Sequence, residues 1–122
     1  MLEEYSELKQ AIEAAGFFTD FQPIKTPGDR MVCASHEYTD GPRKGGLGGN
    51  SFWVAKRGQR WFVASWGPMI YRIGDSARLT SLCLLLLHGA DERAYFDFAE
   101  RVRADFSLVA VSDEEFDNSV AE

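Results

Sequence analysis

Residues 41–50, GPRKGGLGGN, combine five glycines with the adjacent cations Arg43 and Lys44. Glycine-rich loops can turn several backbone amides toward a phosphate, so this segment is a candidate for ligand chemistry. The established patterns do not fit it. A Walker-type loop requires a lysine directly after Gly46, where the chain has Leu47. The SFWVAKR segment that follows has the residue types of a strand, so no helix N-terminus would face an anion.

Two interpretations of this segment stay open. The first is a connection between two strands, in which the glycines supply positive φ angles. The second is a loop that binds a small anionic ligand through its amides and its two cations. The residues of that alternative site are Arg43, Lys44, Gly45, Gly46 and Gly48.

His36 and Glu37 are neighbours that could act as a proton-transfer pair. No catalytic motif accompanies them, so an enzyme is the weakest functional hypothesis and no catalytic residue is predicted. The chain has only two histidines, and metal sites need three or four clustered ligands. We therefore predict neither a metal site nor a cofactor.

A third group of candidates surrounds the Gly-Gln dipeptide at residues 58–59. Cations crowd this turn, although like charges that face each other destabilise a sheet. A solvated tip tolerates them and protects the strand edge from aggregation, and the nearby tryptophans can be core residues. Alternatively, the group is a docking spot for an acidic protein, because tryptophan and arginine dominate binding energies at interfaces. Its residues are Trp53, Lys56, Arg57, Arg60 and Trp66.

A solvated tip also predicts that a double charge reversal, Arg57→Glu with Arg60→Glu, leaves folding nearly intact. The element that positions these residues is a hairpin, SFWVAKRGQRWFVASW. A two-residue Gly-X loop is typical of a type II′ turn, which places Arg57 opposite Arg60 and Trp53 opposite Ala64. Both faces of this hairpin are apolar. Either helices cover both faces, or one face is an exposed aromatic surface.

The remaining elements follow from periodicity, caps and stop signals. Helices are expected over residues 2–15, 76–87 and 91–104, with Asp75 as the N-cap of the second. Strands besides the hairpin are expected over residues 21–25, 31–38, 69–73 and 106–111. Ser112 and Glu115 have the spacing of a capping box.

These elements predict a single compact α+β domain over residues 1–122. It has an N-terminal helix, an antiparallel meander of four or five strands, and two C-terminal helices packed on the sheet. Residues 112–122 form an acidic tail with room for one helical turn.

The net charge of −6 disfavours binding to nucleic acid or to an anionic membrane. The charge is unevenly distributed, because residues 25–78 carry nine cations and four acids whereas both ends are acidic. Whether the acidic ends pair with the basic middle stays open. The longest apolar stretch falls far short of the ~20 residues that span a bilayer. Cys33 and Cys83 are predicted to be buried free thiols, which fits the cytoplasm.

The first functional hypothesis is thus a non-catalytic protein-interaction module of the adaptor or toxin-neutralising type, whose partner has an acidic surface. The second is a binder of a small anionic ligand, and the third is a small enzyme. The sequence does not give the identity of the partner or the oligomeric state.

Overall fold

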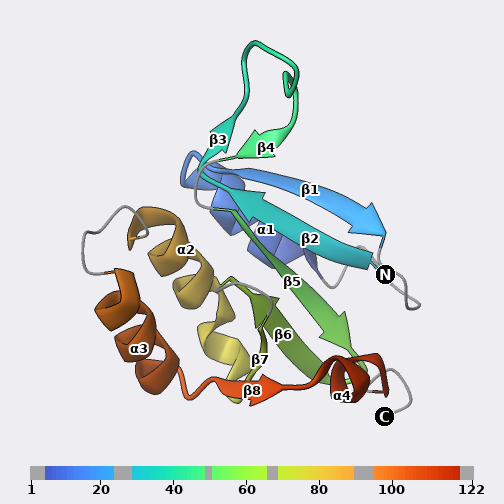
Figure 1. Cartoon of the computed structure of the whole chain (residues 1–122), viewed down its shortest axis with the longest axis vertical. Helices are drawn as coiled ribbons and strands as arrows, with labels where there is room; N and C mark the ends of the chain where they lie inside the picture. The colour runs from blue at the N-terminus through green and yellow to red at the C-terminus, as the bar shows by residue number, and fades with distance from the viewer. Residues whose placement is uncertain (1–4, 24–28, 49–50, 66–68, 90–94, 119–122) are drawn as a thin grey trace.

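The computed structural model describes residues 5–23, 29–48, 51–65, 69–89 and 95–118. They form a six-stranded antiparallel sheet with a layer of helices on one face, a short helix on the other, and a separate two-stranded ribbon (Figure 1). The predicted α+β class and single compact domain are confirmed. The sheet has six strands, where four or five were expected, because the C-terminal strand also joins it.

The strand order of the main sheet is β1-β2-β5-β6-β7-β8, and every neighbouring pair is antiparallel. Its strands are β1 (Phe18–Pro23), β2 (Asp29–Ala34), β5 (Phe52–Arg57), β6 (Arg60–Ala64), β7 (Ile70–Ile73) and β8 (Val109–Val111). The ribbon pairs β3 (His36–Glu37) with β4 (Leu47–Gly48). The helices are α1 (Ser6–Ala14), α2 (Leu79–Gly89), α3 (Tyr95–Asp105) and α4 (Asp113–Asn118), with a 3₁₀ turn η2 (Ser76–Arg78) before α2.

The central hairpin β5–β6 has the predicted register. Arg57 pairs with Arg60, and Trp53 pairs with Ala64. Gly58 begins the turn with a φ of 59°, a conformation that glycine adopts without the steric cost of a side chain. The register fixes which side chains share a face, because alternate residues of a strand point to opposite sides.

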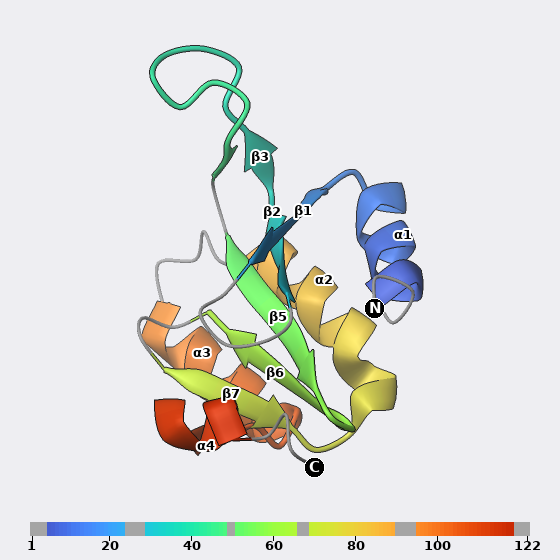
Figure 2. The same ribbon diagram turned by 90° about the vertical axis from the view of Figure 1, so that its right-hand side faces the viewer.

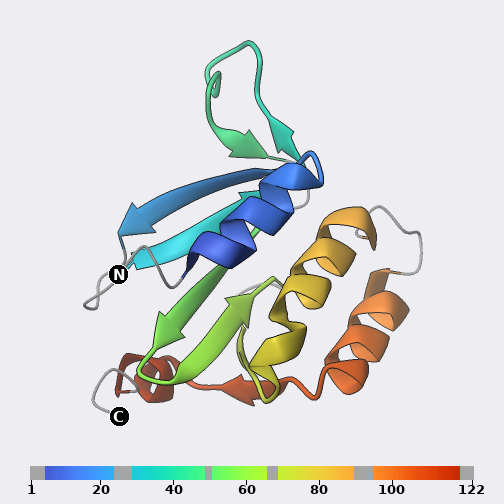
Figure 3. The same ribbon diagram turned by 180° about the vertical axis from the view of Figure 1, so that it is seen from behind.

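One face of the sheet packs against α1, α2 and α3, and Figure 3 shows α1 and α2 lying in front of it. Tyr5, Leu8 and Ile12 point from α1 into this core, where Val54 and Val63 of the hairpin are fully buried. A helical spacing of three or four residues places all three α1 side chains on one stripe, as the sequence predicts.

Two predicted caps set the start of the C-terminal helices. The backbone N–H of Ala77 donates to Oδ1 of Asp75 at 3.1 Å, at the beginning of η2. The backbone N–H of Glu115 donates to Oγ of Ser112 at 3.0 Å, at the beginning of α4. Each cap satisfies a donor that the helix itself leaves unpaired.

The helical layer holds a pair of thiols against the sheet. Cys33 of β2 and Cys83 of α2 are both free and fully buried, as predicted. Their side chains meet, and a hydrogen bond between the two thiols, followed by burial, raises the pKa of Cys83 well above its ordinary value. Because the thiolate is the reactive form, Cys83 is chemically inert in the folded chain.

This raised pKa predicts a loss of stability in alkaline solution. Above about pH 8.5 the unfolded chain releases the Cys83 proton, whereas the folded chain keeps it. The free energy of unfolding therefore falls as pH rises, by up to about 1.4 kcal/mol per pH unit from this group. Urea denaturation between pH 8.5 and 10 is expected to show a steeper fall for the natural chain than for Cys83→Ala. Equal slopes would contradict the assignment.

Candidate functional site

The second face of the sheet is covered by α4 at one end (Figure 1). Beneath α4 lies a small second core, formed by Ala55, Phe62, Ile70, Val111 and Phe116. In Figure 1 no helix lies over β1, β2 and the start of β5 on this side. Of the two possibilities that the apolar hairpin left open, the structure thus shows one fully covered face and one that is covered in part.

Phe116 is the residue that holds α4 on the sheet. Its side chain is 5% exposed, and its ring meets Phe62 edge-on at 5.1 Å between ring centroids. The ring also lies 5.6 Å from that of Trp53, and the guanidinium carbon of Arg57 lies 4.7 Å from the Phe116 centroid. The acidic segment Asp113–Asn118 thus docks on the basic middle of its own chain, so part of the charge asymmetry is satisfied within the molecule.

Arg57 differs from the expectation of a solvated tip. Only 2% of it is exposed, because it shares a face with Phe62 and lies under the aromatic ring of Phe116. Arg60 stands opposite on β6 and is half-buried. A carboxylate at position 57 would be buried against an aromatic ring, so the expected tolerance of the double charge reversal does not hold for Arg57.

The uncovered remainder of this face, here called the open face, mixes apolar and cationic side chains. It consists of Phe18, Arg30, Val32, Trp53, Arg60, Ala64, Arg72 and Val109, all of them half-buried or exposed. Phe18 and Val109, at the two edges of the sheet, are 37% and 49% exposed. The guanidinium carbon of Arg30 lies 5.5 Å from the ring centroid of Trp53, close enough for a cation–π contact.

The structure brings together only part of the predicted docking group. Trp53 and Arg60 lie on the open face, whereas Arg57 is buried under α4. Lys56 lies on the opposite face, beside Trp61, and its backbone N–H donates to the hydroxyl of Tyr5 at 2.9 Å. Trp66 lies outside the described residues.

Sequence reasoning missed three members of the open face, namely Arg30, Val32 and Arg72. Their place beside Trp53 and Phe62 depends on the pairing of β2 with β5 and of β6 with β7. The alternation along each strand was visible in the sequence, but the register between separate strands was not. That register is the signal that would have identified them.

The glycine-rich segment forms the exposed end of the β3–β4 ribbon, which projects away from the main sheet (Figure 2). Gly41 and Gly45 have φ angles of 77° and 87°, which is the role that the connection hypothesis gives to glycine. The amides of the segment are used internally. The N–H of Gly45 donates to the carbonyl of Tyr38 at 2.8 Å, and the N–H of Gly46 donates to that of Arg43 at 2.8 Å.

The N–H of Lys44 also donates within the loop, to the carbonyl of Gly41 at 3.1 Å. Gly48 is part of β4 and pairs with His36. In this conformation the amides of residues 44–46 are therefore not directed at a ligand. Only the two exposed cations of the alternative anion site face solvent, and the Arg43 guanidinium carbon lies 5.9 Å from the Tyr38 ring.

His36 and Glu37 are both exposed on β3. Within the described ranges, neither side chain has a hydrogen bond or an ion pair, so the geometry does not bring a second titratable group to His36. In the same ranges, no three potential ligands among His, Cys, Asp and Glu gather as a metal site would require.

No protein-family model, no curated protein and no solved structure matches the chain. None of the helices in the described part of the chain has the length and apolar character to cross a membrane.

The burial of Arg57 leads to a prediction with a built-in control. Arg57→Glu is expected to lower the free energy of unfolding by about 3 kcal/mol or more, because it buries a carboxylate beside an aromatic face. Arg60→Glu, directly across the strand pair, makes the same charge change at a half-buried site and should cost about 1 kcal/mol or less. Urea denaturation of the two variants measures the difference. Similar losses would show that Arg57 is not buried.

The ribbon leads to a second prediction. Neither buried core contains a residue from 36–48. Replacing residues 39–46 by an Asn-Gly turn should therefore change the free energy of unfolding by less than about 1 kcal/mol. Thermal and urea denaturation of the shortened chain test this expectation, and a loss of several kcal/mol would show that the ribbon supports the sheet.

Proposed function

We propose that the protein is a non-catalytic interaction module, of the adaptor or toxin-neutralising type, that binds an acidic protein through the open face. The observation that carries the proposal is the half-exposed Trp53 at the centre of a sheet face that α4 leaves uncovered. Contiguous apolar surface of this kind on a small domain is typical of a binding site.

The composition of the open face supports a protein partner. Tryptophan and arginine contribute the largest binding energies at protein interfaces, and here Arg30 lies over the Trp53 ring. This stacking restrains both side chains before a partner arrives, which lowers the entropy lost on binding. A central aromatic residue with cations around it matches the usual arrangement of an interface core and its polar rim.

The charge of the open face supports an acidic partner. Its charged members are all arginines, namely Arg30, Arg60 and Arg72, although the whole chain carries −6. Asp20 of β1 is the exposed acidic neighbour on the same side as Val32. A cationic face on an acidic protein steers an acidic partner to one orientation, and salt should weaken the encounter.

The two buried free thiols, Cys33 and Cys83, agree with a reducing compartment. We therefore place this interaction in the cytoplasm.

Capture from native cell extract at low and at moderate salt tests the proposal. The full chain is expected to retain one acidic protein in stoichiometric amount, with less retained as salt rises. Val32→Glu places a carboxylate on the open face and should weaken the captured complex at least about tenfold. Leu85→Glu is the matched control, because Leu85 is a 38% exposed aliphatic residue of α2 on the helical layer.

Isothermal titration with the captured protein then gives the two dissociation constants. The proposal fails if the natural chain retains no acidic protein. It also fails if Val32→Glu binds the partner as tightly as Leu85→Glu does, while circular dichroism shows both variants folded.

A further inference from the structure

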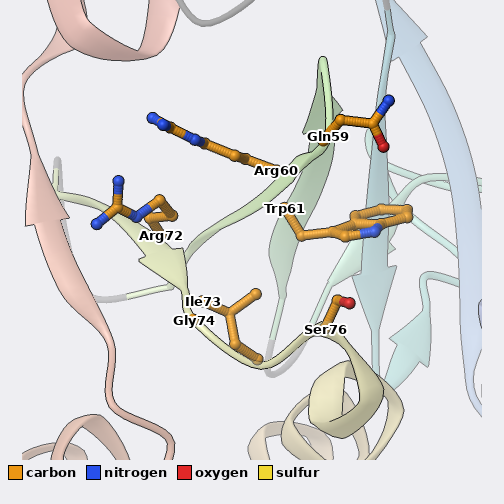
Figure 4. Close-up of a pocket in the computed structure, with 7 residues that line it drawn as sticks. All are labelled: Gln59, Arg60, Trp61, Arg72, Ile73, Gly74 and Ser76. Carbon is orange, nitrogen blue, oxygen red and sulfur yellow. The ribbon is translucent and has the colours of Figure 1, made fainter. Parts of the chain in front are cut away.

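Beyond the last residue pair of β6 and β7 lies a hollow of about 290 Å³. It is lined by Gln59, Arg60, Trp61, Arg72, Ile73, Gly74 and Ser76 (Figure 4). We propose that this hollow binds a small phosphate-bearing ligand between the guanidinium groups of Arg60 and Arg72.

The two arginines converge because of the strand register. Phe62 pairs with Arg72, and Arg60 lies two residues before Phe62 on the same face. Arg60 and Arg72 are therefore diagonal neighbours on adjacent strands, with Cβ atoms roughly 7–8 Å apart. Figure 4 shows both side chains extending to the same side, away from Trp61. Two guanidinium groups at this spacing can each donate two hydrogen bonds to one phosphate.

The hollow exists because a glycine follows β7. Continuing the β6–β7 register by one residue places Gly74 beside Arg60, so no side chain fills the space next to the Arg60 stem. A Cβ atom at Gly74 would meet the backbone oxygen of Ser107 at 4.0 Å and no closer atom outside its chain neighbours. The volume is near the lower end of the range for ligand pockets, which suits a ligand with a small anionic head.

The polar lining is rich in donors. The Gln59 amide and the Ser76 hydroxyl can donate in addition to the arginines, and the lining residues include no aspartate or glutamate. The nearest carboxylate in sequence, that of Asp75, already accepts the N–H of Ala77. A hollow with this charge pattern selects anions over cations.

One wall is held rigid before any ligand binds. The Trp61 ring packs edge-on against Tyr5 at 5.1 Å, and the Tyr5 hydroxyl accepts the backbone N–H of Lys56. A fixed wall reduces the ordering that a ligand must impose.

The site differs from the anion loop expected from the glycine-rich segment. It uses side-chain donors at the opposite end of β5 from the ribbon, and it binds a free small molecule rather than a protein. Its test is therefore independent of the acidic-partner proposal.

Inorganic phosphate is the probe. At 10 mM sodium phosphate the thermal midpoint of the full chain should rise relative to sodium chloride of equal ionic strength. For a dissociation constant of about 1 mM the rise is roughly 5 °C. The double variant Arg60→Gln with Arg72→Gln should lose this rise. The control, Arg43→Gln with Lys44→Gln, removes the same charge from the ribbon and should keep it.

The proposal is overturned if phosphate and chloride act alike on the natural chain, or if both double variants lose the rise equally. The single variant Arg72→Gln guards against misfolding, because Arg72 has no hydrogen bond, ion pair or ring contact among the described residues. Its dissociation constant for phosphate, measured by NMR titration, should rise at least about tenfold. An unchanged constant also overturns the site.

Discussion

The central hairpin is apolar on both faces, and the rest of the structure depends on the need to remove both faces from water. Val54 and Val63 point to one side, and Ala55 and Phe62 point to the other. An isolated sheet of this kind is unstable in water, because each face exposes contiguous apolar area. The chain covers the first face with three helices and the second with a single short one, so the two halves of the core differ greatly in depth.

This unequal cover gives α4 an influence beyond its six residues. It is too short to be stable as an isolated helix, and its position depends on the insertion of one aromatic ring. Phe116 contacts the rings of Trp53 and Phe62 while Arg57 packs on the same ring. Because Trp53 also belongs to the open face, the helix and any molecule bound to that face touch a common residue.

Local signals in the sequence were sufficient for the elements. The stripe of α1, the turn at Gly58, and the caps at Asp75 and Ser112 all involve residues within a few positions of one another, and the structure confirms each. Pairings between distant segments were not predictable in the same way. The burial of Arg57 requires Phe116, 59 positions later in the numbering, and the contact of Cys33 with Cys83 joins β2 to α2. Hydrophobic periodicity says which face of a segment is buried, but not which segment buries it.

The late position of β8 and α4 in the chain has a consequence for synthesis. Phe62, Ile70 and the other residues of the second core emerge from the ribosome well before residues 109–118, which complete their cover. During that interval a nearly finished sheet has one bare apolar face, and surfaces of this kind make nascent chains prone to aggregation and dependent on chaperones. The second face is thus closed last by the order of translation, and the open face is the part of it that folding never closes.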